Sequence, residues 1–348
     1  MSRMFFNKLF ERLVNVNTAV IFMITALVIG GSSFAIYYIE PEEFGSPFNG
    51  FWWVMTSVTT VGFGDYVPDT VPGKLYGIFL YLVGIGLISI VISKIIDFIY
   101  VYNRRKERGK LEYNGKDHIV IADWSKHAKI AIQEILNTEK NIEIVLIDQY
   151  EETPYHHDRL FYVRGNPVDK EVLEQANISE ARAVFVFPNE ITINGEYIHD
   201  PSYIDGKSLL IATSIQRHFK DIYTIVEIKE RNNIHNFTHV DVDEFIVSSE
   251  MISQLAVRSA FSRGTSRIVS QLLSKRHGED LYEIPKRPSW KTYREAYMAL
   301  LEEGATLVSD HDDLNINHKL DERIPEDAKL FVICQEDTYH KISGKEAN

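Results

Sequence analysis

A short run at positions 60 to 65 has the composition of a backbone that binds cations. Glycine occupies its third and fifth positions and an aspartate ends it: Thr60, Val61, Gly62, Phe63, Gly64 and Asp65. Glycine adopts dihedrals that a Cβ atom opposes, so alternating glycines let successive carbonyl groups point to one side. Thr60 adds a hydroxyl oxygen at one end of this ladder. A row of such oxygens can replace the hydration shell of an ion.

Two uncharged stretches flank this run. Residues 13 to 39 carry no charge, and the part from Ala19 to Ile39 has about the 20 residues that a helix needs to cross a hydrocarbon core. A second uncharged run extends from Leu75 to Ser93. We interpret both as membrane spans, at about 16–39 and 75–102.

The aromatic segment from Phe48 to Thr59 is too short to cross a membrane, and the glycine-alternating run follows it directly. Irregular backbone at membrane depth is tolerated only where it lines a cavity holding water or ions. We therefore expect a pore helix and filter at 48–66, and we expect Gly62 and Gly64 to be intolerant of alanine.

Basic residues near span ends are retained on the cytoplasmic side. They precede the first span and follow the second: Arg3, Lys8, Arg12, Arg104, Arg105, Lys106, Arg108 and Lys110. The connecting segment is acidic, with Lys74 its only basic residue. Both termini are thus predicted to be cytoplasmic, in a multi-pass protein of the cell membrane.

The formal net charge of −12 argues against a nucleic-acid partner, which would need clustered basic surface. A lone Cys334 excludes an intrachain disulfide and a cysteine-built metal site.

Beyond a charged segment at 103–117, short β-rich runs alternate with helical patterns. Such alternation favours a parallel sheet covered by helices. The predicted fold is multi-domain: an α-helical two-span pore module with a reentrant loop at 1–102, a linker at 103–117, an α/β Rossmann-like lobe at 118–248, connecting helices at 249–275 and a small α+β lobe at 276–348. Gly264 is expected to interrupt the connecting helices.

The first turn of the Rossmann-like lobe lacks the three glycines of a dinucleotide fingerprint and has Asp123, Ser125 and Ala128 instead. Asp123 would repel a phosphate there. Asp148 closes the second strand, where it either accepts bonds from ribose hydroxyls or serves as a turn residue. Arg164 and Asn166 close the third strand as further ligand candidates. The sequence has no phosphate-binding loop of the hydrolase type, so no enzymatic activity is predicted.

The run TTVGFGD resembles the potassium-channel signature, with Phe63 in the usual position of tyrosine. The resemblance implies that K⁺ binds at Thr60, Val61, Gly62 and Phe63, and that Trp52 bonds to Asp65 as filter support. It also implies a gating hinge at Gly84, although close helix packing is an alternative explanation for that glycine.

The whole chain resembles two-transmembrane potassium channels with an RCK regulatory domain (KTN type, TrkA-N plus TrkA-C). The resemblance implies a homotetrameric pore in the lipid bilayer and a cytoplasmic gating ring that a small ligand, a nucleotide or a divalent cation, expands. The alternatives are a nonselective monovalent cation channel or a membrane-anchored nucleotide-binding regulatory subunit. An extra soluble RCK copy in the ring also remains open.

Calcium-activated relatives carry an acidic pair on the fifth strand, and only Glu227 is retained here, because Lys229 replaces the second acid. Glu227 is therefore a weakened candidate for a regulatory divalent cation. An insertion at 189–206 is expected to be a solvated loop, or else a metal site built from four side chains: Glu190, Glu196, His199 and Asp200.

Overall fold

The computed structural model describes residues 17–191, 195–274 and 278–344. The chain divides into two compact units, Met1–Arg105 and Lys106–Asn348. Arg3, Lys8 and Arg12 lie outside the described residues, as do residues 1–16 of the expected pore module, 192–194 of the insertion, 275 of the expected connecting helices, and 276–277 and 345–348 of the expected last lobe.

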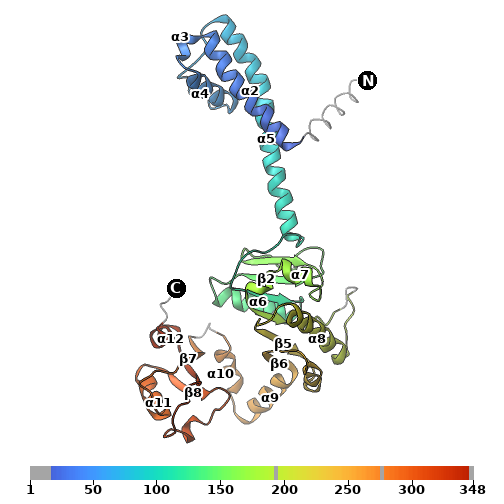
Figure 1. Cartoon of the computed structure of the whole chain (residues 1–348), viewed down its shortest axis with the longest axis vertical. Coiled ribbons are helices and arrows are strands. Elements are labelled where there is room, and N and C mark those ends of the chain that lie inside the picture. Colours follow the sequence, from blue (N-terminus) through green and yellow to red (C-terminus); the bar gives the residue numbers. More distant parts are fainter. Residues whose placement is uncertain (1–16, 192–194, 275–277, 345–348) are drawn as a thin grey trace. The chain divides into compact units, whose positions relative to one another are not determined.

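The first unit is built from helices α2 (Thr18–Ile39), α3 (Pro41–Phe44), α4 (Pro47–Val58) and the first part of α5 (Val71–Glu107) (Figure 1). Helices α2 and α5 are long and apolar enough to cross a membrane. Helix α4 begins where the Ser46 side chain accepts from the Asn49 amide, with Pro47 in the first turn. It packs against α2 at Gly50, where a Cβ atom would lie 2.5 Å from the Ser33 carbonyl oxygen.

Helix α5 extends further than expected, because it continues past residue 102 to Glu107, into the predicted linker. The extra turn consists of Asn103, Arg104, Arg105, Lys106 and Glu107, and arginine, lysine and glutamate are good helix formers. The chain turns shortly afterwards at Gly109, whose φ is +61°.

The carboxylate of Glu40 joins the end of α2 to the beginning of α5. Although only 5% exposed, Glu40 accepts hydrogen bonds from the backbone amides of Asp69 and Thr70, both at 2.9 Å, and from the Thr70 hydroxyl at 2.5 Å. Thr70 in turn accepts from the Gly73 amide in the first turn of α5. This buried carboxylate therefore fixes the two membrane helices to each other at one end.

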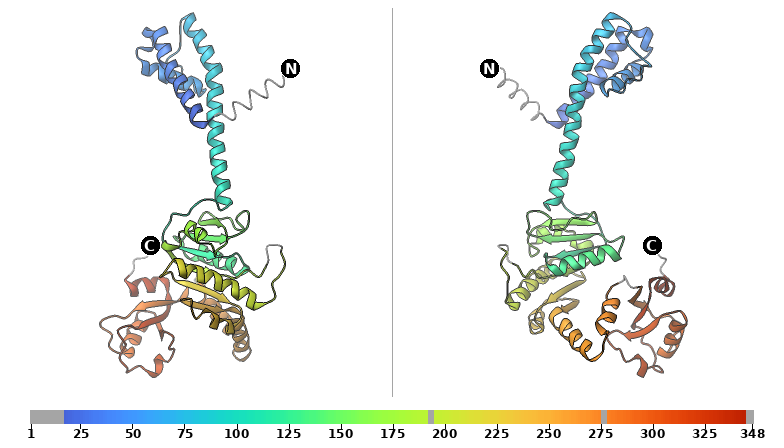
Figure 2. Two further views of the ribbon diagram at one scale, coloured as in Figure 1. Left: turned by 45° about the vertical axis from the view of Figure 1, so that its right-hand side comes forward. Right: turned by 180° about the vertical axis from the view of Figure 1, so that it is seen from behind.

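The second unit begins with a six-stranded parallel sheet of order β3-β2-β1-β4-β5-β6. Its strands are β1 (His118–Ala122), β2 (Ile144–Asp148), β3 (Leu160–Arg164), β4 (Ala181–Val186), β5 (Thr224–Ile228) and β6 (Glu244–Val247). Helices α7 (Lys170–Gln175) and α8 (Pro201–His218) share a core with one face, and α6 (Lys126–Thr138) packs on the other (Figure 2). This is the predicted doubly wound lobe.

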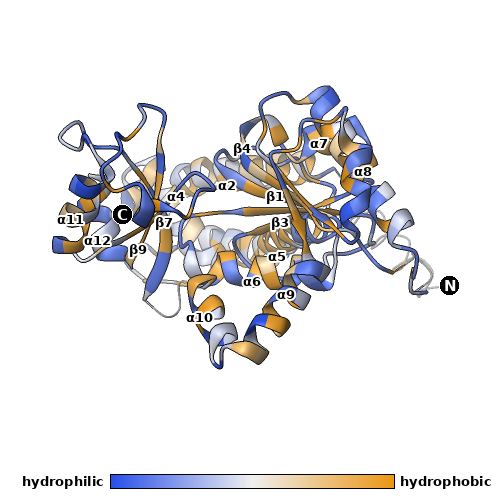
Figure 3. Ribbon diagram, turned by 90° about the horizontal axis from the view of Figure 1, so that it is seen from below, coloured by the Kyte–Doolittle hydropathy of each residue, from blue (hydrophilic) through white to orange (hydrophobic). Residues whose placement is uncertain are grey.

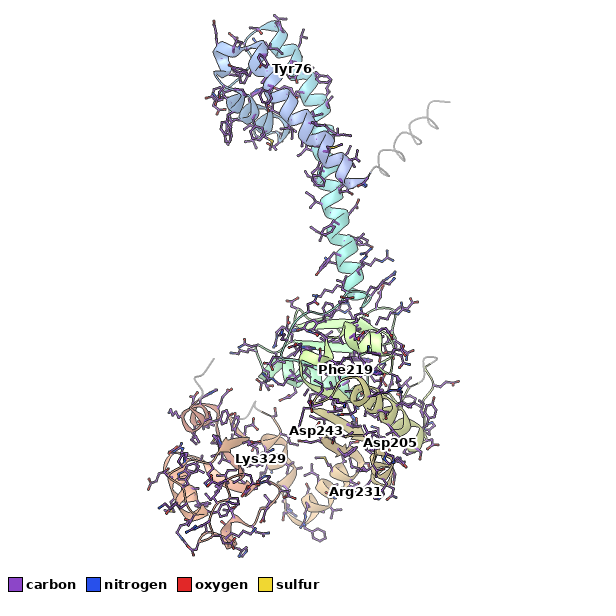
Figure 4. All side chains as sticks on the ribbon, in the orientation of Figure 1. Tyr76, Asp205, Phe219, Arg231, Asp243 and Lys329 are labelled. Atoms are coloured by element: carbon purple, nitrogen blue, oxygen red, sulfur yellow. The ribbon has the colours of Figure 1, made fainter. Side chains whose placement is uncertain are left out.

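Carboxylates hold both ends of β5. The Asp243 side chain accepts from the Thr224 amide at 2.7 Å, and the buried Asp205 accepts from the Lys229 amide at 2.8 Å (Figure 4). Buried backbone donors need such partners. The end of β5, where Glu227 lies, is therefore held firmly against α8.

Part of the insertion at 189–206 is helical, so the expectation of a loop throughout was wrong. Helix α8 begins at Pro201, inside the insertion. The reason is local, since Asp200 caps the helix by accepting from the Ser202 amide at 2.9 Å and proline is favoured in a first helical turn.

After the sheet, the expected helical stretch is split into α9 (Ser248–Phe261) and α10 (Thr265–Leu272) by Gly264, whose φ is +97°. The last lobe has an antiparallel sheet of order β7-β9-β8. Its elements are β7 (Glu279–Pro285), α11 (Tyr293–Glu302), β8 (Thr306–Asp310), β9 (Lys329–Gln335) and α12 (Glu336–Ser343). The short 3-10 turns are Ile178–Glu180, Arg231–Phe237 and Ile316–His318.

Candidate ion and ligand sites

The backbone after α4 alternates in handedness. Thr60, Gly62 and Gly64 have φ values of +62°, +57° and +77°, whereas Val61 and Phe63 do not have positive φ. The Val61 and Gly62 amides both donate to the Thr56 carbonyl, at 2.9 and 3.1 Å. Within the described residues, the carbonyls of 60–64 accept no hydrogen bond. The run therefore leaves a series of oxygens free for a ligand.

Thr60 adopts this conformation at a cost. A left-handed backbone is unfavourable by about 1–2 kcal/mol for a residue with a Cβ atom, whereas Gly62 and Gly64 adopt it freely. Strain of this kind persists only where its surroundings impose it. Here the Thr60 amide is held by the Ser57 carbonyl at 3.0 Å, at the end of α4.

Trp52 supports this run from the side. Its indole Nε1 donates to the Asp65 carboxylate at 2.6 Å, and its ring stacks on Phe63 with centroids 5.8 Å apart and planes 4° from parallel. Phe63 thus has a ring contact where a tyrosine would offer a hydroxyl. Asp65 is engaged as a brace and is not one of the residues in the carbonyl series.

Gly84 lies at a close approach between α5 and the pore helix α4. A Cβ atom there would be 2.5 Å from Cγ2 of Val58, whereas one at Gly86 would meet no atom within 4 Å. The contact supports the packing explanation for Gly84. It leaves the hinge a prediction.

In the turn after β1, Asp123 has a φ of +76°, a left-handed conformation that glycine usually adopts. Its carboxylate is buried, forms an ion pair with Lys207 of α8 and accepts from the Asn189 amide at 3.3 Å. Burial raises the pKa of Asp123, although Lys207 opposes this rise. The place where a pyrophosphate would approach the backbone thus holds an internal ion pair.

Asp148 is committed to the same turn. Its carboxylate accepts from the Trp124 amide and from the Gln149 amide, both at 2.6 Å. Burial, together with the nearby charge of Asp123, raises the pKa of Asp148 to about 6. These bonds match the role of a turn residue, and a ribose would have to compete with them.

Ser125 caps α6 by accepting from the Ala128 amide at 3.1 Å. It also lines a cavity of about 220 Å³ with aromatic and basic walls, formed by Trp124, Lys126, His127, Tyr150, Asn189, Glu190 and Tyr197. The cavity lies at the carboxyl ends of the neighbouring strands β1 and β4, where the strand order reverses direction. This is the switch point at which ligands bind in open α/β sheets.

Arg164 and Asn166 lie elsewhere, on an open groove of about 560 Å³ that Lys110 and Gln149 also line. The structure therefore separates the sequence-predicted ligand residues. Asp123, Ser125 and Asp148 surround the first turn, whereas Arg164 and Asn166 face the linker.

Glu227 is the centre of a buried polar network. Its carboxylate accepts from Lys229 at 2.8 Å and from Ser248 at 2.7 Å, and it contacts His127 Nδ1 at 2.8 Å. Lys229 also pairs with Glu190 at 2.7 Å. The lysine ammonium thus takes the place that a divalent cation would need.

The described parts of the chain contain no group of three or more histidine, cysteine, aspartate or glutamate side chains that could hold a metal ion. The alternative of a metal site in the insertion therefore finds no support in these residues, since Glu190 pairs with Lys229 and Asp200 caps α8. Lys207 was missed at the sequence level. Lys207 is the seventh residue of α8, and its sequence neighbourhood carries no signal of a partner 84 positions earlier.

Comparisons with known proteins agree with this arrangement. Residues 19–101 match the ion channel family model and residues 119–248 match the TrkA-N domain model. The putative potassium channel protein YugO of Bacillus subtilis is 26% identical over 275 residues, which cover 78% of this chain and 82% of that protein. The calcium-gated potassium channel TvoK of Thermoplasma volcanium is 25% identical over 71% of this chain and 69% of its own length.

Among solved structures, the human SLO3 gating ring matches 66% of this chain and 47% of its own chain, with 14% identity and a TM-score of 0.50. At that identity, the match concerns the fold. Together these findings confirm the resemblance: the chain joins an ion-channel pore domain to a TrkA-N domain and is a relative of the two-transmembrane potassium channels that carry an RCK domain.

Proposed function

We propose that four copies of this chain form a potassium-selective channel. The observation that carries the proposal is the alternating φ of residues 60–64, whose carbonyls have no acceptor role in the described residues. One chain supplies one quarter of a ring of such oxygens, so a closed fourfold assembly completes the coordination of a dehydrated K⁺ ion. A nonselective monovalent cation pore is the alternative that measurement must separate.

In this proposal α2 and α5 span the cell membrane and the second unit is cytoplasmic. Basic residues follow the second span directly, among them Arg104, Arg105 and Lys106, whereas the segment between the spans is acidic. The retention of basic residues on the cytoplasmic side supports this orientation. Both termini then face the cytoplasm.

The second units would pair through α9 and α10. Neither helix has a buried residue, although hydrophobic residues occupy much of both (Figure 3). The exposed apolar side chains on them are Met251, Ile252, Val257, Phe261 and Ile268. A cluster of exposed apolar side chains marks an interaction surface. A second copy of the chain is the partner that a ring requires, and the sequence leaves open whether further soluble copies join it.

A small ligand would gate the pore from the cavity at the switch point. The walls of this cavity, Trp124, Tyr150 and Tyr197 with Lys126, suit a planar ligand that carries negative charge. The Lys207–Asp123 pair opposes a pyrophosphate on the turn, and Lys229 opposes a divalent cation at Glu227. A ligand shifts a closed–open equilibrium only by its difference in affinity for the two states.

The test is single-channel recording of the purified protein in bilayers under a potassium/sodium gradient, with candidate ligands added to each face. Wild type should reverse near the potassium equilibrium potential, and Gly62→Ala should abolish selective current. Gly206 lies in α8, where an added Cβ atom would meet nothing within 4 Å, so Gly206→Ala is a matched control. A tetramer that conducts sodium and potassium equally would refute selectivity.

A further inference from the structure

The groove beside the linker contains two basic side chains without a partner among the described residues. Lys110 and Arg164 are exposed, and neither makes a side-chain hydrogen bond or ion pair in that part of the chain. The groove measures about 560 Å³, which is within the range of small-molecule sites. Two basic side chains that line one groove without a partner give it a positive potential, which attracts an anion.

The other walls indicate the kind of anion. The amide side chains of Gln149 and Asn166 add hydrogen-bond donors, and Arg164 presents the planar fork that matches phosphate oxygens in pairs. Asp169 contributes one carboxylate to the same lining, so the ionised side chains sum to a single positive charge. The Asp169 carboxylate disfavours a ligand with many negative charges. It favours a ligand that carries one phosphate and, elsewhere, hydrogen-bond donors.

Two linker residues, Gly109 and Lys110, form part of the lining of the groove. The Gly109 carbonyl accepts from the Arg164 amide and from Gln175 Nε2, both at 3.0 Å. A Cβ atom on Gly109 would lie 2.3 Å from the Arg164 amide nitrogen, so the linker approaches β3 as closely as glycine permits. Lys110 follows only three residues after the end of α5 at Glu107.

We propose that this groove binds the phosphate group of a small soluble ligand between Lys110 and Arg164, and that the bound phosphate fastens the linker to β3. This site is separate from the first turn, where Asp123 and Lys207 already neutralise each other. Binding at the groove stands on these contacts alone. Its effect on channel opening rests on the proposed function.

The test uses the full-length protein in phosphatidylcholine nanodiscs and isothermal titration with inorganic phosphate, then with adenosine monophosphate, at constant ionic strength. Lys110→Gln and Arg164→Gln should each raise the dissociation constant about tenfold or more, since each removes a charge-assisted contact. Lys116→Gln, which removes a linker cation that pairs with Glu180, is the matched control and should bind phosphate as wild type does. Lys126→Gln reports binding at the switch-point cavity instead of the groove.

Equal affinity in all five proteins, or a loss confined to Lys126→Gln, would overturn the proposal. Adding phosphatidylglycerol to the discs identifies the source of the phosphate. If the lipid weakens phosphate binding in wild type and not in Arg164→Gln, the headgroup occupies the groove, and the soluble ligand is wrong. Because titration requires no current, a channel that fails to conduct leaves this result intact, and a failure to bind phosphate leaves selectivity intact.

Discussion

Replacing Lys229 tests whether an internal cation holds the end of β5. Its ammonium bonds to Glu227 at 2.8 Å, and the two side chains are 14% and 2% exposed. Removing one partner of a buried pair leaves the other charge uncompensated, at a cost of about 3–5 kcal/mol. Lys229→Met should therefore lower the midpoint of thermal unfolding by on the order of 10 °C.

The pH dependence of this loss gives a second criterion. Burial raises the pKa of Glu227, but hydrogen bonds from Lys229, His127 and Ser248 outweigh burial and hold the pKa below its usual 4.5. In wild type this group therefore contributes stability above pH 4.5, which is lost as the pH falls through the lowered value. Without Lys229 the pKa should rise, so the deficit of Lys229→Met should be larger at pH 8 than at pH 5.

Thermal unfolding of the full-length protein, followed by tryptophan fluorescence at both pH values, provides the assay. The double variant Lys229→Met/Glu227→Gln should recover much of the loss, because it removes both charges. Lys116→Met breaks an exposed pair with Glu180 and should change the midpoint little. A deficit below about 2 °C, or one that is independent of pH and not recovered by the second change, would refute the reasoning.

Three further substitutions follow from the same geometry. Gly84→Ala should destabilise the pore by about 1–3 kcal/mol, since its Cβ atom would lie 2.5 Å from the Val58 side chain. Adding Val58→Ala should restore the stability of the tetramer on heating. Gly86→Ala, whose Cβ atom would meet nothing within 4 Å, should have no effect. In wild type, protonation of Asp148 should stabilise the folded state by about 3 kcal/mol as the pH falls through its raised pKa of about 6. Thermal unfolding of Asp148→Asn should lack this gain. Glu40→Gln should lower the unfolding temperature of the pore through weaker bonds to the start of α5, and an unchanged value would contradict that role.

The chain was most predictable where function depends on the backbone of consecutive residues. Alternating glycines at 62 and 64 predicted the unusual dihedrals, and the structure has positive φ at both. Gly264 likewise predicted the break between α9 and α10. In these places the local sequence decides the conformation, because only glycine adopts it without strain.

Contacts between distant residues could not be predicted in this way. Lys207 of α8 meets Asp123, and Lys229, which follows β5, meets Glu190 of the insertion, only through the packing of segments that are distant in the sequence. The expectation of a loop throughout 189–206 is a different kind of error, because α8 begins at Pro201. The signal was local, an aspartate before a proline at 200–201, and the polar composition of the insertion concealed it.

The measurement that tests the central claim most directly is the reversal potential of the reconstituted channel under opposed potassium and sodium gradients. The carbonyls of 60–64, left free by the alternating φ, predict a reversal potential close to that of potassium and its collapse in Gly62→Ala. A reversal potential near zero in folded, tetrameric wild-type protein would contradict the claim that this backbone is a potassium filter.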